Sequence, residues 1–108
     1  MDKTIHNWFN SLDKEFDGDK VDPNSNSVFH FKISGEEGGE YTVIIENSKL
    51  HVATGLIEKS KCEISATDQN FKNILLRISN PGIALANGKL KITNVAEVLR
   101  FAKPLGLL

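Results

Sequence analysis

The 108-residue chain has a single cysteine, Cys62, and no long apolar run, and these absences exclude several classes of protein. A lone cysteine forms no internal disulfide, so nothing in the sequence argues for an oxidising compartment. No stretch approaches the roughly 18 apolar residues of a membrane span. The N-terminus lacks a basic segment followed by an apolar one, so we expect no signal peptide, and the last three residues are not a peroxisomal signal. The expected location is therefore cytoplasmic.

Net charge is also low, at −1, but the charges are unevenly distributed. Residues 1–40 carry nine acids and four bases, whereas residues 41–108 carry five acids and nine bases, giving −5 and +4. Proteins that bind nucleic acids usually have a strong basic excess, so we expect no nucleic-acid partner. The basic half is either an ordinary solvated face or a surface that meets an anionic headgroup or membrane.

Sequence motifs for catalysis are missing. The chain has no nucleophile elbow, phosphate loop or dinucleotide fingerprint. Cys62 is expected to be a small core residue, because neighbouring Lys61 would point to the opposite face of a strand and not activate a thiolate. Asp68 and Glu97 are interpreted as helix-capping residues. We expect no cofactor and no enzyme, although acid–base pairs need no motif and catalysis is left as an alternative.

Metal-binding patterns are weak as well. His30, His51 and Cys62 would form a zinc site if the fold brought them together, but none has the close spacing of typical zinc ligands. The aspartates of the loop at residues 17–27 lack the glycine and the closing glutamate of a calcium loop. We therefore expect no metal.

Hydrophobic periodicity predicts one α+β domain over residues 1–108. Short polar turns between the first four strands predict an antiparallel meander with one face in water. Thr67 or Asp68 is expected to cap one helix, Asn80 the next and Asn94 the last. The expected helices are residues 4–16, 71–78, 81–87 and 95–105, and the expected strands are residues 28–34, 40–46, 49–54, 62–66 and 89–92.

The last three expected helices carry more apolar residues than one face of a small sheet obviously needs. Two interpretations account for this surplus: a filled core or a cavity for a ligand. Protein interiors are normally close-packed, so the residue pattern alone favours the filled core.

A short motif favours the ligand cavity over the filled core. Ala86-Asn87-Gly88-Lys89-Leu90-Lys91-Ile92 resembles the Gln-Gly-Lys-Leu-Lys-Ile signature of the sterol carrier protein type-2 family of lipid-binding domains, with Asn87 in the place of Gln. Residues 28–41, 47–55 and 62–71 resemble further parts of that family, and the resemblance covers about residues 5–105. One departure is at Ala84 and Ala86, which stand where larger apolar residues are common and would either enlarge a cavity or tighten helix packing. The other is Asn94, which replaces a common glycine and is interpreted as the cap of the last helix.

The resemblance implies a fold and a function. It implies a five-stranded, mainly antiparallel sheet, with helices covering one face and a hydrophobic tunnel between the layers. It also implies a non-enzymatic protein that binds or transfers a fatty acid, acyl-CoA, sterol or similar apolar ligand. On this basis, the expected ligand-binding residues are Leu75, Ile78, Ile83, Leu85, Asn87, Leu99, Phe101 and Ala102.

Within that set, Asn87 is expected to offer a polar contact. The residues expected to attract an anionic headgroup or a transient membrane surface are Lys89, Lys91, Arg100 and Lys103. The alternative is a non-catalytic interaction module of the same fold with a filled cavity. That module would dock on a partner protein through the apolar C-terminal tail, residues 105–108.

Overall fold

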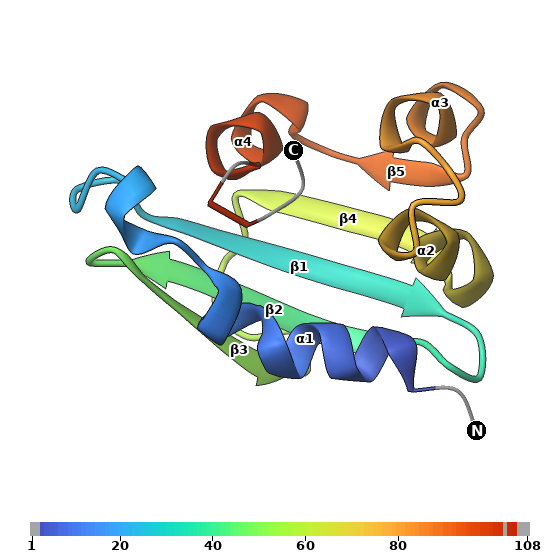
Figure 1. Cartoon of the computed structure of the whole chain (residues 1–108), viewed down its shortest axis with the longest axis horizontal. Helices are drawn as coiled ribbons and strands as arrows, with labels where there is room; N and C mark the ends of the chain where they lie inside the picture. Colours follow the sequence, from blue (N-terminus) through green and yellow to red (C-terminus); the bar gives the residue numbers. More distant parts are fainter. Residues whose placement is uncertain (1–2, 103, 106–108) are drawn as a thin grey trace.

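A five-stranded sheet with helices on one face is formed by residues 3–102 and 104–105, the part of the chain that the computed structural model describes (Figure 1). The strands are β1 (Ser27–Ser34), β2 (Gly39–Glu46), β3 (Lys49–Thr54), β4 (Cys62–Thr67) and β5 (Leu90–Ile92). The helices are α1 (Thr4–Glu15), α2 (Asp68–Leu75), α3 (Pro81–Ala86) and α4 (Val95–Phe101), with a short 3-10 helix, η1 (Gly18–Lys20), after α1. This confirms the predicted α+β fold.

The strand order across the sheet is β3-β2-β1-β4-β5. Three of its four neighbouring pairs are antiparallel, so the sheet is mainly antiparallel as predicted. The prediction of a meander through four strands is wrong for β4, which pairs in parallel with β1. Since β3 and β4 run in the same direction, no tight turn can join them. Residues 55–61 instead cross the sheet from β3 to the far side of β1, ending where the Lys61 N–H donates to the Val28 carbonyl oxygen at 2.9 Å.

This crossover covers part of the face that the sequence predicted to meet water. The hydroxyl of Thr42 accepts from the Ile57 N–H at 3.0 Å and donates to the Gly55 carbonyl at 2.7 Å. A ring nitrogen of His30 lies 2.9 Å from the Ile57 carbonyl oxygen. Thr42 and His30 are consequently buried. The prediction of a wet outer face is therefore wrong beneath the crossover.

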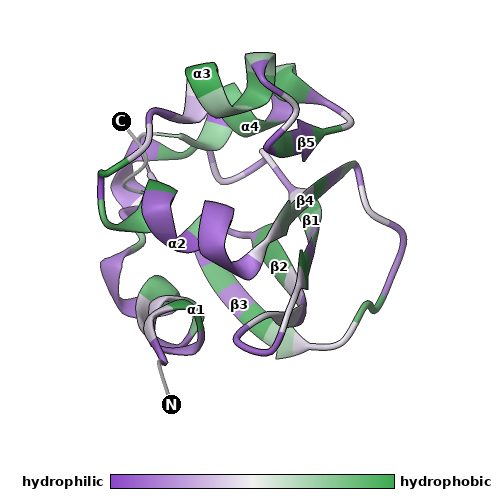
Figure 2. Cartoon of the chain, turned by 90° about the vertical axis from the view of Figure 1, so that its right-hand side faces the viewer, coloured by the Kyte–Doolittle hydropathy of each residue, from purple (hydrophilic) through white to green (hydrophobic). Residues whose placement is uncertain are grey.

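The helices occupy the other face of the sheet. The apolar stripe of α1 packs onto it through Phe9, whose ring stacks on Tyr41 with centroids 3.9 Å apart. Trp8 meets the Phe71 ring of α2 edge-on at 5.7 Å, which joins α1 to α2. In the side view of Figure 2, α1 and α2 lie on one side of the strands, and α3 is coloured mainly hydrophobic whereas α2 shows a mainly hydrophilic surface. The buried residues of α1 are Ile5, Phe9 and Leu12.

Helix α2 begins at the predicted cap but ends earlier than predicted. Thr67 is its N-cap and accepts a hydrogen bond from the Asn70 N–H at 3.2 Å. The helix ends at Leu75, and Arg77 adopts a left-handed φ of 63° in the turn that follows. Ile78 consequently lies in the connection to α3 and not on the helical face where the periodicity had placed it.

Candidate ligand-binding site

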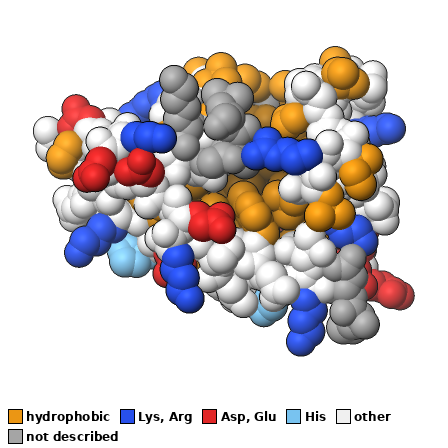
Figure 3. Space-filling model, viewed as in Figure 1, with side chains coloured by type: hydrophobic (Ala, Val, Ile, Leu, Met, Phe, Trp, Pro, Cys, Tyr) orange, Lys and Arg blue, Asp and Glu red, His pale blue; other side chains and the backbone are white. Residues whose placement is uncertain are grey.

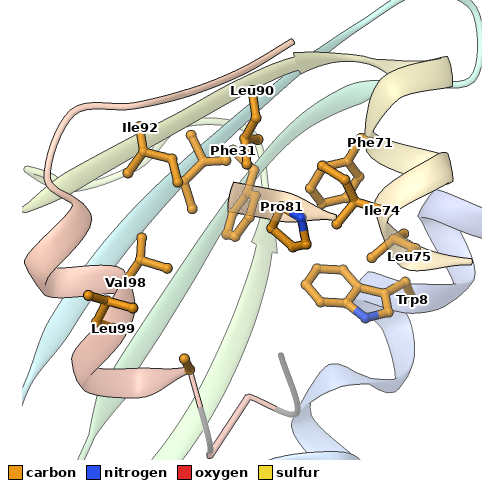
Figure 4. A pocket seen from close by; sticks show the side chains of 12 residues that line it. Trp8, Phe31, Phe71, Ile74, Leu75, Pro81, Leu90, Ile92, Val98 and Leu99 are labelled. Carbon is orange, nitrogen blue, oxygen red and sulfur yellow. The ribbon is translucent and has the colours of Figure 1, made fainter. Parts of the chain in front are cut away.

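An apolar pocket of about 150 Å³ lies between the sheet and the helices α2, α3 and α4. The space-filling view in Figure 3 shows a hollow on this side of the molecule with hydrophobic side chains visible inside it. Figure 4 shows how the side chains surround the pocket. Its lining residues are Trp8, Phe31, Ile64, Phe71, Ile74, Leu75, Pro81, Leu90, Ile92, Val98, Leu99 and Ala102.

The floor of the pocket comes from three neighbouring strands. Phe31 of β1 is opposite Ile64 of β4, and Ile64 is opposite Ile92 of β5, so the three side chains form one row across the sheet. Leu90 lies two residues before Ile92 and shares its face, because side chains alternate along a strand. Strand alternation therefore builds an apolar floor on the side where the helices pack.

Two short helices form facing walls. On α2, Phe71, Ile74 and Leu75 are spaced three and four residues apart, which places them on one helix face. On the opposite wall, Val98 and Leu99 point from α4 toward the same space (Figure 4). Pro81 of α3 and Trp8 of α1 complete the lining between these walls, and Figure 4 shows both rings between the residues of α2 and those of α4. The pocket therefore lies over the sheet, between α2 and α4.

Helix α4 is fixed to the sheet by a buried carboxylate. The Ser27 hydroxyl donates to one oxygen of Glu97, and the Arg100 guanidinium donates to the other at 2.7 Å. The Asn94 side chain caps the helix by accepting from the Glu97 N–H at 3.2 Å. Burial by itself raises the pKa of Glu97, but its bonds to Ser27 and Arg100 outweigh burial and hold that pKa below its usual value. Glu97 therefore anchors a pocket wall, beyond the capping role interpreted from sequence.

The structure brings three of the eight predicted ligand-binding residues to the pocket lining: Leu75, Leu99 and Ala102. Phe101 is buried, but its ring packs against Phe29, with centroids 5.9 Å apart, and is not part of the lining. Ile78 and Ile83 are 70% and 62% exposed. Leu85 is half-buried and Asn87 is exposed at the end of α3, and neither lines the pocket.

Sequence periodicity missed most of the lining because it did not fix how each helix is rotated about its axis. Val98 and Phe101 are three residues apart on α4, yet only Val98 lines the pocket. The strand residues had a clearer signal: alternation placed Phe31 and Ile64 on the apolar face of their strands. That face forms the pocket floor beneath the helices.

The two alanines of α3 do not enlarge the pocket. Ala84 is buried, and its carbonyl accepts from the Lys89 N–H at 2.9 Å, which holds α3 against the start of β5. Ala86 is exposed. Neither contributes to the lining, so Ala84 allows close packing of the helix rather than a wider cavity.

The side chains considered for metal binding or nucleophilic chemistry lie elsewhere. Strand β2 separates His30 on β1 from His51 on β3. Cys62 is buried with its sulfur 3.4 Å from the Asn94 carbonyl oxygen, and burial raises the pKa of its thiol. Within residues 3–102 and 104–105, no three His, Cys, Asp or Glu side chains are grouped so that they would hold a metal ion. No helix in that part of the chain has the length and hydropathy to cross a membrane.

Comparisons with known proteins agree with this geometry. Residues 9–103 match the model of the SCP-2 sterol transfer family. The chain is 30% identical over 90 residues to "Sterol carrier protein 2" of Homo sapiens, a match that covers 79% of this chain and 16% of that protein. The chain thus spans about a sixth of the length of this curated relative.

Solved structures share the fold at low identity. The stereoselective inverting sec-alkylsulfatase Pisa1 from Pseudomonas sp. is similar with a TM-score of 0.72 and 19% identity, over 94% of this chain and 16% of that one. Palmitated SCP2L2 from Aedes aegypti is similar with a TM-score of 0.64 and 18% identity, over 95% of this chain and 93% of that one. At these identities the likeness concerns the fold alone.

Proposed function

The chain belongs to the SCP-2 sterol transfer family, a family of lipid-binding and transfer domains, and from this premise we propose that its apolar pocket binds the hydrocarbon chain of a fatty acid or similar lipid. The observation that carries the proposal is the composition of the lining, in which all twelve side chains are apolar. Such a pocket favours hydrocarbon through the hydrophobic effect, without a specific polar contact.

The pocket is open enough for a chain to enter. Leu99 lines it and is also 62% exposed, and Pro81 lines it and is exposed, so the pocket reaches the molecular surface between α3 and α4. A cavity of this volume holds a ligand about the size of benzene. A longer fatty-acid chain would therefore extend through this opening or move the helices apart. Palmitated SCP2L2 has the same fold and supports a fatty acid as the first ligand to test.

Among the predicted ligand-binding residues, we propose that Leu75, Leu99 and Ala102 contact the hydrocarbon chain directly. Phe101 would act indirectly, by packing α4 against Phe29 on β1. Asn87 lies at the end of α3, and would contact a headgroup that leaves the pocket beside that helix. Ile78, Ile83 and half-buried Leu85 belong to the surface around the opening in this proposal.

The expected affinity is moderate. Once the helices move apart to enclose about ten methylenes, their burial contributes roughly 8 kcal/mol at about 0.8 kcal/mol each. Before ordering costs, that energy corresponds to a dissociation constant of about 1 μM. Such a ligand is released quickly enough for transfer, because differences in affinity act mainly through the dissociation rate.

Binding without catalysis is part of the proposal. The described residues of the pocket lining include no titratable side chain, so they offer no acid, base or nucleophile to a bound substrate. The sec-alkylsulfatase with this fold is an enzyme, but the likeness covers only 16% of its chain. We propose that the present chain holds lipid in the cytoplasm and exchanges it with an anionic membrane surface, with no nucleic acid involved.

The only tryptophan of the chain, Trp8, lines the pocket and provides the assay. As cis-parinaric acid is added, energy transfer from Trp8 to the bound probe should increase until the binding sites are saturated. Adding palmitate should displace the probe and lower the energy transfer again. Native mass spectrometry of freshly purified protein should show a copurified lipid. Absence of energy transfer, displacement and copurified lipid together would contradict the proposal.

Such a result would favour the alternative of a non-catalytic module with a filled cavity. In that alternative the apolar tail docks on a partner. Leu105 is buried, whereas residues 106–108, like the predicted headgroup contact Lys103, lie outside the part of the chain that the structure describes. Self-association that is abolished by deleting the tail would support the alternative.

A further inference from the structure

Exposed large hydrophobic side chains are concentrated around the pocket. Six are exposed within the described residues, and five of these lie between residues 76 and 99, while the sixth, Ile57, lies in the crossover on the outer face of the sheet. We refer to the five as the pocket rim: Leu76, Ile78, Ile83, Val95 and Leu99. Exposed apolar residues that gather in one region mark a surface that contacts something other than water.

The rim belongs to the same segments that form the pocket. Leu99 is part of the lining, Ile83 follows the lining residue Pro81 on α3, and Leu76 follows the lining residue Leu75. Figure 3 shows hydrophobic side chains over α3 and α4 and beside α2, around the hollow. Whatever covers the rim therefore also faces the pocket opening.

The charged side chains in this part of the chain are mostly basic. Residues 69–108 contain six bases and one acid, Glu97, whereas residues 1–68 contain seven bases and thirteen acids. Glu97 is buried and hydrogen-bonded to Ser27 and Arg100, so it presents little negative charge to solvent. Arg77 lies between two rim residues, and Lys89 is exposed between α3 and β5. Among the described residues of this segment, the exposed charged side chains are therefore basic, and an apolar surface with neighbouring bases complements an anionic lipid surface.

Helix α1 has a different surface. Its exposed positions include both acids and bases, such as Asp13, Lys14 and Glu15, and none is a large hydrophobic residue. Its apolar stripe is already buried against the sheet. The amphipathic first helix therefore offers a bilayer neither apolar side chains nor a net positive face.

We propose that the pocket rim docks on an anionic phospholipid bilayer, with the rim side chains in the boundary between headgroups and acyl chains and the flanking bases at the phosphates. This proposal rests on the lipid-binding function and adds the orientation of the domain on the membrane. The pocket opening then faces the bilayer, so a hydrocarbon chain moves between membrane and pocket without crossing water. The cost of exposing that chain to water, about 0.8 kcal/mol per methylene, is avoided.

The test measures partitioning of the chain onto vesicles of phosphatidylcholine with and without phosphatidylglycerol, by cosedimentation. The wild type should bind only the vesicles that contain phosphatidylglycerol. The double variant Ile78→Ser/Ile83→Ser should bind them at least about tenfold more weakly, because two inserted side chains are lost. Ile57→Ser is the matched control, since it removes an exposed isoleucine from the other face, and it should bind like the wild type.

A variant that removes one positive charge tests the electrostatic contribution to membrane binding. Lys89→Gln should weaken binding about fivefold, the contribution of one base near an anionic membrane surface. Lys14→Gln on α1 is its control and should leave binding unchanged. Binding of the wild type to these vesicles should also weaken as the ionic strength rises, because salt screens the attraction between the bases and the phosphates.

The vesicle-free cis-parinaric acid assay separates this proposal from the function on which it rests. The rim variant Val95→Ser should weaken vesicle binding but keep its affinity for cis-parinaric acid, because Val95 is exposed and does not line the pocket. Failure of the wild type to bind the probe would overturn the lipid-binding function. Normal probe binding combined with vesicle binding that the rim variants leave intact would overturn only the docking surface. Self-association abolished by the same variants, without vesicle binding, would also overturn it by assigning the rim to a second copy of the chain.

Discussion

The hydroxyl of Ser27, the first residue of β1, donates a hydrogen bond to the carboxylate of Glu97 in α4, 70 residues later in the chain. Both residues are buried. Arg100 binds the other carboxylate oxygen, so a buried negative charge is balanced by a hydroxyl on the sheet and a cation on the helix. This contact fixes α4, which supplies Val98 and Leu99 to the pocket.

Breaking this contact should destabilise the chain. Ser27→Ala removes one hydrogen-bond donor and leaves one oxygen of the buried Glu97 carboxylate without that partner. We therefore expect the free energy of unfolding to fall by about 1–3 kcal/mol. Urea unfolding followed by circular dichroism measures the change. Glu63→Gln is the control, because that carboxylate pairs with Lys32 on the exposed face of the sheet and should matter little. Equal effects of the two variants would contradict a special role for Ser27.

The same carboxylate predicts a pH dependence. The folded-state pKa of Glu97 is below its usual value, so the folded state favours the ionised form more than the unfolded state does. Its contribution to stability is complete above the unfolded pKa of about 4.3 and is lost as the pH falls through the folded pKa. The stability difference between wild type and Glu97→Gln should therefore be constant near neutral pH and shrink below about pH 4. A difference that grows on acidification would contradict this sign.

The crossover gives a third prediction. Thr42 is fully buried and bonds both Gly55 and the Ile57 N–H, so Thr42→Val keeps its shape but leaves two backbone groups of the crossover without their partner. We expect a loss of about 1–3 kcal/mol in urea unfolding. Thr54→Val is the matched control, because Thr54 is exposed at the end of β3, and its effect should stay within about 0.5 kcal/mol. Similar losses in both variants would mean that the crossover is held by other contacts.

These elements also show what the sequence could predict. The local sequence was sufficient to predict the N-cap residues of three helices. The expected backbone hydrogen bonds are accepted by the side chains of Thr67, Asn80 and Asn94. The place of β4 was not predictable from local signals, because residues 55–61 are short enough to be taken for a hairpin loop. Their crossing depends on partners on distant strands, such as Thr42.

The pocket was predictable in kind but not in detail. Family resemblance implied a cavity under the last helices, and Leu75, Leu99 and Ala102 line it. Ile78 was expected to line the cavity from a helix over residues 71–78, but α2 ends three residues earlier, at Leu75. Helical periodicity defines a stripe about a third of a turn wide or more, whereas a pocket uses only part of that stripe.

A large side chain placed inside the pocket should exclude the ligand. Ala102 is buried at the end of α4 and lines the pocket, so Ala102→Phe should place a ring in a space of about 150 Å³ and weaken cis-parinaric acid binding at least about tenfold. Ala96→Phe is the matched control, because Ala96 is exposed on the same helix. Titration by energy transfer from Trp8 compares the two, with circular dichroism showing that both fold. If Ala102→Phe binds as well as Ala96→Phe, the ligand lies outside this pocket. If both lose binding, α4 tolerates no added ring, and Leu99→Ser, at an exposed position on the pocket lining, then tests the site without adding volume.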